Sequence, residues 1–199
     1  MVNELEIKYL ETLKRIDQLN QILKTCGGKF KGKKYLLREK NQLLKLKDIL
    51  EFEIANNPKT FFVDKFGFTV RSYTKRTRGK PRYLVYKGKT QNQMNGCLLH
   101  NPIYQLSYVW LDNNSQLTRK DIQKALKVAK EIFEDAIVVT DKRHIHTLTF
   151  RKRYTQTIER LISRIKIPIY PELAKAKSPK DVYDIYFERM RELGINIIP

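Results

Sequence analysis

The chain has 199 residues, of which 40 are Lys or Arg and 21 are Asp or Glu, so its formal net charge is +19. Apolar residues make up 41% of the chain and aromatic residues 11%, which excludes a wholly disordered protein. No apolar run is long enough to span a membrane, and two widely separated cysteines exclude a disulfide framework or a zinc motif.

The chain opens on an acidic, amphipathic segment instead of a basic start followed by an apolar core. We therefore expect no secretory signal. Together with Cys26 and Cys97, whose spacing fits free thiols, this predicts a cytoplasmic or other reducing intracellular compartment.

The first 58 residues predict two helices. Apolar side chains recur at steps of three and four over residues 3–24, and Gly27 and Gly28 end that helix. A basic loop, 29–34, leads into a second helix of about 22 residues, in which Leu36, Leu43 and Leu50 are one heptad apart. The short loop favours an intramolecular antiparallel hairpin. The same apolar seams could instead pair between chains as a coiled coil, so residues 1–58 are also a candidate surface for a homodimer or a protein partner.

After Pro58 the pattern changes to the alternation of strands. Strands are predicted at 66–75, 82–87 and 104–111, with a turn at 75–81 and a loop at 88–96. A helix is predicted to begin at Thr118, with Asp121 completing a capping box. Two further strands (136–140 and 143–151), a helix over 154–165 and a last helix from Ser178 to Gly194 follow.

These elements predict an α+β fold. We expect an N-terminal antiparallel helical hairpin over 1–58 and a mixed basic domain over 59–199. The sheet of that domain is expected to be mainly antiparallel, with helices packed against it.

The positive charge is concentrated in two segments. Residues 59–99 carry ten basic side chains and one acidic one, and residues 142–166 carry eight basic side chains and one acidic one. A concentrated positive field attracts polyanions, so the composition predicts a nucleic-acid partner and no membrane partner.

The predicted hairpin 66–87 combines basic and aromatic side chains on one face and at its turn. Lys and Arg neutralise phosphates, and Tyr stacks on bases. A ribbon of two strands fits the DNA major groove. The candidate nucleic-acid-binding residues are Arg71, Tyr73, Lys75, Arg76, Arg78, Lys80, Arg82 and Lys87, with a second patch at Arg143, Arg151, Lys152 and Arg153.

An alternative prediction starts from His144-Ile145-His146, where two histidines alternate on one strand face. This segment resembles the His-hydrophobic-His signature of the HUH endonucleases. That resemblance implies a divalent metal, Mg²⁺ or Mn²⁺, held by His144 and His146. It also implies a tyrosine nucleophile on a later helix, at Tyr183 or Tyr186, where Tyr186-Phe-Glu-Arg189 approximates the family's Tyr-x-x-Lys.

The sequence thus favours non-enzymatic binding of nucleic acid, DNA ahead of RNA, without a cofactor. Two alternatives remain open: an HUH-like, metal-dependent endonuclease acting on single-stranded DNA, and a structural component of a ribonucleoprotein particle.

Overall fold

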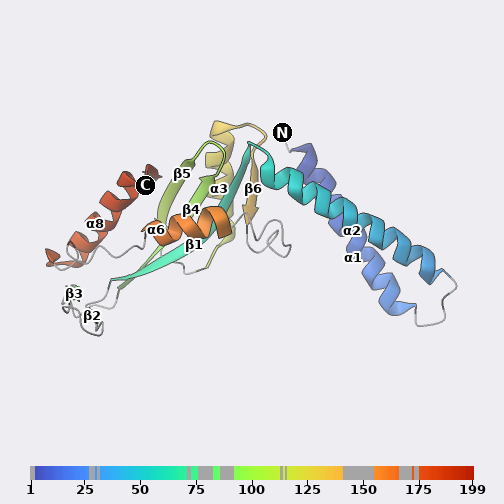
Figure 1. Ribbon diagram of the computed structural model, residues 1–199, viewed down its shortest axis with the longest axis horizontal. Helices are drawn as coiled ribbons and strands as arrows, with labels where there is room; N and C mark the ends of the chain where they lie inside the picture. Colours follow the sequence, from blue (N-terminus) through green and yellow to red (C-terminus); the bar gives the residue numbers. More distant parts are fainter. Residues whose placement is uncertain are drawn as a thin grey trace.

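The computed structural model describes residues 3–26, 30, 32–70, 73–75, 83–85, 92–112, 114, 116–140, 155–165, 172 and 175–199. The fold is α+β, as predicted: two N-terminal helices precede a mixed five-stranded sheet with further helices. Figure 1 shows the two helices side by side at one end of an elongated molecule and the sheet at its middle.

Helices α1 (Glu4–Thr25) and α2 (Lys33–Asn56) run antiparallel. Arg15 of α1 pairs with Glu39 of α2 at 2.8 Å, and Tyr9 donates a hydrogen bond to Glu51 at 3.0 Å. Buried apolar side chains from both helices, among them Leu19 and Leu50, fill the seam. The predicted helical hairpin is therefore present within one chain.

The base of this hairpin is attached to the sheet by polar contacts. Thr60 donates from its hydroxyl to the backbone oxygen of Ile54 at 2.7 Å, and the side-chain amide of Asn101 donates to the backbone oxygen of Pro58 at 2.7 Å. Leu50 and Ile54 of α2 lie in the same buried cluster as sheet residues. The hairpin is thus fixed to the sheet at one end.

The sheet contains β1 (Thr60–Val70), β4 (Asn92–Asn101), β5 (Leu106–Asp112), β6 (Ile137–Thr140) and β7 (Ile195–Ile197), in the order β6-β1-β4-β5-β7. The central pairs β1–β4 and β4–β5 are antiparallel, and the edge pairs β1–β6 and β5–β7 are parallel. The three central strands thus form an antiparallel meander, in line with the mainly antiparallel sheet expected from the sequence, but both edges are parallel. The edge strand β7 was not predicted.

The predicted strand pairing after Pro58 is confirmed in part. The segment 66–75 was expected to pair with 82–87, and residues 73–75 do pair with 83–85. Residues 66–70 instead belong to β1, which begins at Thr60 and pairs with β4, a strand that starts inside the expected loop 88–96. A separate two-stranded ribbon forms between them, from β2 (Tyr73–Lys75) and β3 (Tyr83–Val85). The first part of β4 has little local strand preference and becomes a strand because it pairs with β1 in the sheet.

Gly96 of β4 shows why that segment can occupy the middle of the sheet. A Cβ atom at this position would lie 2.6 Å from Cζ of Phe66, its cross-strand neighbour. The glycine therefore gives room for a buried aromatic ring, which is the usual reason for glycine inside a strand.

Helices cover both faces of the sheet. Helix α3 (Arg119–Ile132) packs against Phe61, Val63 and Trp110 on one face. The other face is covered by the base of the hairpin, by α6 (Arg160–Ile165), which follows a π-helical turn at Thr155–Glu159, and by α8 (Pro179–Glu192). In the part of the chain that the structure describes, no helix has the length and apolar character needed to cross a membrane.

The predicted helix ends of α3 and α8 are confirmed. Thr118 and Asp121 form a capping box at the start of α3, and Ser178 and Asp181 form one at the start of α8. After α8, Gly194 adopts a φ of 70°, a conformation that favours glycine.

Candidate nucleic-acid interface

Most of the predicted phosphate-binding residues lie outside the described residues. This applies to Arg71, Arg76, Arg78, Lys80, Arg82, Lys87, Arg143, Arg151, Lys152 and Arg153, and also to His144 and His146. Of the predicted set, Tyr73 and Lys75 lie in β2, where Tyr73 is opposite Val85 and Lys75 is opposite Tyr83. The two-stranded form expected for the basic segment is therefore present over three residue pairs.

Tyr183 and Tyr186, the nucleophiles of the alternative prediction, lie on α8. Both side chains are half-buried and pack against the core cluster that contains Met190. Within the described residues, no three His, Cys, Asp or Glu side chains gather into a group that could hold a metal ion. The described contacts of both tyrosines are packing contacts, and His144 and His146 lie outside the described residues.

A basic surface that the sequence did not reveal lies on α3. The outward face of this helix carries four exposed cations, Arg119, Lys120, Lys127 and Lys130. At about 100° per residue, all four fall within an arc of about 100° along about 17 Å of helix. Among the described residues, none of the four has a carboxylate within ion-pair distance. We call these four residues the α3 basic face.

Two of the four acidic residues of 118–136 are engaged away from this face. Asp121 is buried under the helix, and Asp135, after the helix, pairs with Lys59 at 2.8 Å. Glu131 is exposed at the edge of the arc and is the one carboxylate beside it on α3. A strip of this length matches a stretch of duplex that carries roughly ten phosphates on its two strands, at one charge per about 1.7 Å.

Lys124 borders the α3 basic face, but its ammonium group contacts Trp110 and Pro199. Its Nζ lies 5.6 Å from the centroid of the Trp110 ring and donates a hydrogen bond to the Pro199 backbone oxygen at 2.7 Å. The ring and the C-terminal residue thus hold the lysine against the body of the protein.

Asp121 fixes α3, and with it the basic face, to the sheet. Its Oδ2 accepts from the Thr118 backbone at 2.8 Å and lies 3.3 Å from Nζ of Lys65, while its Oδ1 accepts from the Trp110 indole at 3.2 Å. Burial raises the pKa of Asp121, but the hydrogen bonds from Thr118 and Trp110 outweigh it and hold that pKa well below its usual range. The carboxylate is therefore ionised and joins β1, β5 and α3.

Lys65 is buried between two carboxylates. Its ammonium pairs with Asp112 as well as Asp121, and its side chain is 6% exposed. This internal network therefore places one positive charge between two negative ones. The cations of the α3 basic face are separate from the network and point to solvent.

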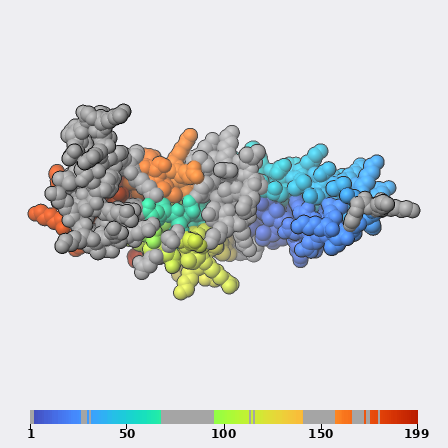
Figure 2. All heavy atoms as spheres, turned by 90° about the horizontal axis from the view of Figure 1, so that it is seen from below, coloured from blue at the N-terminus to red at the C-terminus, as the bar shows by residue number. Residues whose placement is uncertain are grey.

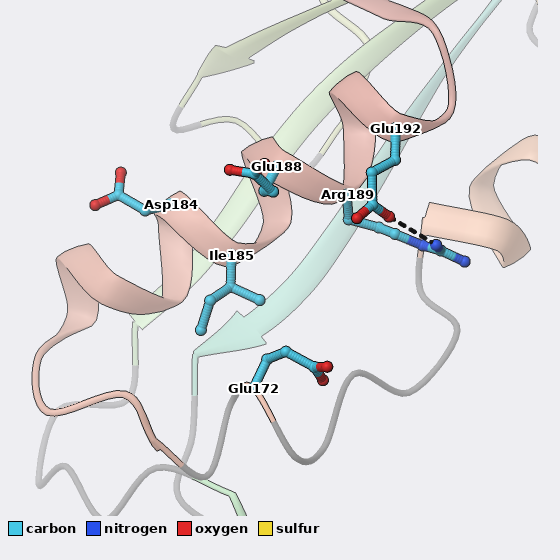
Figure 3. A pocket seen from close by; sticks show the side chains of 6 residues that line it. All are labelled: Glu172, Asp184, Ile185, Glu188, Arg189 and Glu192. Carbon is cyan, nitrogen blue, oxygen red and sulfur yellow. Dashed lines mark hydrogen bonds and ion pairs between the residues drawn. The ribbon is translucent and has the colours of Figure 1, made fainter.

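A pocket of about 360 Å³ on α8 has the opposite charge. Figure 3 shows its lining, with Arg189 and Glu192 turned toward each other at a nitrogen–oxygen distance of 3.0 Å. The pocket is lined by Glu172, Asp184, Ile185, Glu188, Arg189 and Glu192. Four carboxylates against one guanidinium repel a phosphate backbone, so this flank is unsuited to a polyanion.

His100 and Cys97 are neighbours in sequence but lie on opposite faces of β4. His100 Nδ1 is 2.8 Å from the Ser107 hydroxyl, and burial lowers its pKa to about 4, with a backbone hydrogen bond at Leu106 acting the other way. Burial raises the pKa of the Cys97 thiol, and Asp121 acts in the same direction. Both groups are neutral and serve packing.

The net charge of residues 118–136 gave no indication of the α3 basic face. The five basic and four acidic residues of 118–136 leave a net charge of only +1. The signal is the spacing: Lys120 and Lys127 are seven apart, and Lys127 and Lys130 three apart, so they share one helix face.

Comparisons with known proteins add no assignment: no protein-family model matches the chain, and no curated protein sequence or solved structure matches it significantly.

Proposed function

We propose that the protein is a non-enzymatic nucleic-acid-binding protein that contacts the phosphate backbone. The observation that carries this proposal is the α3 basic face, where four cations point to solvent without a carboxylate partner among the described residues. Uncompensated cations on a rigid helix are suited to displace counterions from a polyanion.

The rest of the charge distribution supports the same partner. The segments 59–99 and 142–166 together carry 18 basic and two acidic side chains. The ribbon β2–β3 lies between β1 and β4 in the chain order. Strands β1 and β4 also pack against α3. DNA is favoured over RNA because a two-stranded ribbon fits the major groove of B-form DNA, whereas the A-form major groove is too narrow.

The experiment is a titration of the full chain against labelled duplex DNA, single-stranded DNA and duplex RNA at two salt concentrations. We expect binding that weakens steeply with salt, with duplex DNA bound at least as tightly as duplex RNA. Absence of binding to all three ligands at low salt would contradict the proposal. Preference for duplex RNA would shift the function to a ribonucleoprotein component.

A further inference from the structure

The far end of the helical hairpin carries a second cluster of positive charge. We define the hairpin tip as the described residues among 22–40, namely 22–26, 30 and 32–40. It holds five basic residues and one acidic residue, whereas residues 1–21 and 41–58 hold five basic and seven acidic residues. The single acid of the tip, Glu39, is already paired with Arg15 at 2.8 Å. The charge of the hairpin is thus strongly polarised toward its tip.

Exposed aromatic side chains accompany these charges. Tyr35 is 76% exposed and Phe30 is 45% exposed. A Cβ atom at Gly32 would collide with the Phe30 ring, so the glycine allows that ring to lie against the backbone at the start of α2. Lys34 and Arg38, at neighbouring positions of the same helix, are exposed beside Tyr35.

Helix stability does not account for these residues. Gly32, at the N-cap of α2, makes no side-chain capping hydrogen bond, and the first turn contains no acidic residue. Lys33 and Lys34 instead occupy this turn, where the helix dipole disfavours cations. A sequence that departs from local preferences at an exposed position often does so for binding.

We propose that the hairpin tip binds single-stranded nucleic acid, with a base stacked on Tyr35 and phosphates held by Lys34 and Arg38. Stacking on an aromatic ring requires an unpaired base, which an acidic protein surface lacks, and the positive charge favours a polyanion over a neutral surface. The α3 basic face, which carries no aromatic side chain, has no comparable means of recognising a base.

The position of the tip adds a geometric consequence. Helix α2 has 24 residues, so the tip lies about 36 Å along the helix from the junction with the sheet. Figure 2 shows the hairpin in blue extending away from the rest of the molecule. A ligand with a duplex arm and a single-stranded arm can therefore contact the body and the tip together, and it should bind more tightly than either arm alone.

This inference rests on the proposed function and names the form of nucleic acid that the tip recognises. The test measures fluorescence anisotropy of the full chain with three labelled ligands: a single-stranded oligonucleotide, a blunt duplex, and the same duplex with a single-stranded overhang. The variant is Tyr35→Leu, which removes the stacking ring from an exposed position. The matched control is Phe52→Leu, which removes a 62% exposed aromatic ring from the other end of α2.

We expect Tyr35→Leu to weaken single-strand binding about tenfold, the effect of removing one stacked base, and to leave the blunt duplex unaffected. Tyr35→Trp should retain single-strand affinity, and Phe52→Leu should match the wild type. The overhang ligand should lose its advantage over the blunt duplex in the Tyr35→Leu variant. Equal single-strand affinity of Tyr35→Leu and wild type would overturn the inference, while continued duplex binding would leave the proposed function intact.

Two further measurements on the Tyr35→Leu variant would reveal a different partner of the tip. Loss of binding to phosphatidylserine vesicles by Tyr35→Leu, with oligonucleotide affinity unchanged, would identify the tip as a membrane contact and overturn the inference. A dimer in sedimentation velocity that Tyr35→Leu converts to a monomer, again with unchanged oligonucleotide affinity, would overturn it in favour of self-association.

Discussion

Lys65 on β1 and Asp121 on α3 form an ion pair inside the protein, with 3.3 Å between Nζ and Oδ2 and side chains only 6% and 5% exposed. This pair joins β1, next to the central strand of the sheet, to the helix that carries the α3 basic face. Because charges in such surroundings are costly to leave unpaired, we expect the pair to contribute both to the stability of the fold and to the placement of the face.

The first prediction concerns Asp121→Asn. This change leaves Lys65 with Asp112 as its remaining carboxylate partner and weakens the cap of α3. We expect the free energy of unfolding to fall by about 2–4 kcal/mol, as measured by urea denaturation. The exposed Asp184→Asn serves as the control and should change the free energy by less than about 0.5 kcal/mol. Equal effects of the two changes would show that the buried network does not hold α3.

The second prediction concerns pH. The pKa of His100 is about 4 in the folded protein, below its ordinary value of 6.5. Below pH 6.5 the unfolded chain therefore binds a proton that the folded protein does not bind until about pH 4. The stability contributed by the neutral imidazole is complete above pH 6.5 and declines as the pH falls through this window, by about 3 kcal/mol in all.

His100→Gln should remove that part of the pH dependence. Chemical denaturation of both proteins between about pH 7 and pH 4 would show a shallower decline for the variant. Parallel curves would mean that another group is responsible. Asp121, whose pKa is depressed, contributes stability that disappears only at lower pH, so it does not obscure this window.

The third prediction concerns the base of the hairpin, where Tyr9 donates a hydrogen bond to the fully buried Glu51. Burial raises the pKa of the Tyr9 phenol, and Glu51 acts in the same direction, so the phenol remains a donor. The other carboxylate oxygen, Oε2, has no hydrogen-bond partner among the described residues. Tyr9→Phe should lower the free energy of unfolding by about 1–3 kcal/mol, because it removes a donor from a buried carboxylate.

The double variant Tyr9→Phe/Glu51→Leu should be more stable than Tyr9→Phe alone, since it also removes the buried charge. Thermal unfolding of the two variants checks this. Glu51 also forms an ion pair with Lys47 at 3.6 Å, so a double variant less stable than the single one would contradict the prediction and show that this pair outweighs the cost of the buried carboxylate.

How far the sequence predicts this fold depends on whether the signal is local. The ends of α3 and α8 were predicted because capping residues act within one turn of their helix. Strand β4 was missed because Asn95 and Gly96 have low strand preference, and only their position between β1 and β5 makes them part of the sheet. The edge strand β7 has three residues and offers no periodicity to detect.

The candidate site shows the same limit. The composition predicted a polyanion partner, but a net charge counts a buried carboxylate such as Asp121 against exposed lysines such as Lys127. The burial of Asp121 depends on its contacts with Lys65 and Trp110, which are distant in sequence. The spacing of the lysines predicts that they share one helix face, but the tertiary structure is needed to show that Asp121 is buried away from them.

The fourth prediction concerns the basic segment named from the sequence. We consider the replacement of Arg76, Arg78 and Arg82 by Gln. For duplex DNA, the magnitude of the slope of log K against log salt concentration should fall by roughly two to three. Each phosphate that is no longer neutralised reduces that magnitude by about 0.9. An unchanged slope would show that these arginines do not contact the backbone.

The most direct test of the α3 basic face as a nucleic-acid contact compares two triple variants. The quantity measured is the salt dependence of their affinity for duplex DNA. One is Lys120→Gln/Lys127→Gln/Lys130→Gln on the α3 basic face. The other is Lys175→Gln/Lys177→Gln/Lys180→Gln, which removes the same charge from exposed positions just before α8 and in its first turn. Gln retains good helix propensity, so both variants should fold as the wild type does. We predict that the first variant reduces the magnitude of the slope of log K against log salt concentration by roughly two to three, and that the second leaves it nearly unchanged. Equal reductions in the two variants, or no reduction in the first, would contradict the assignment of the α3 basic face as a nucleic-acid contact.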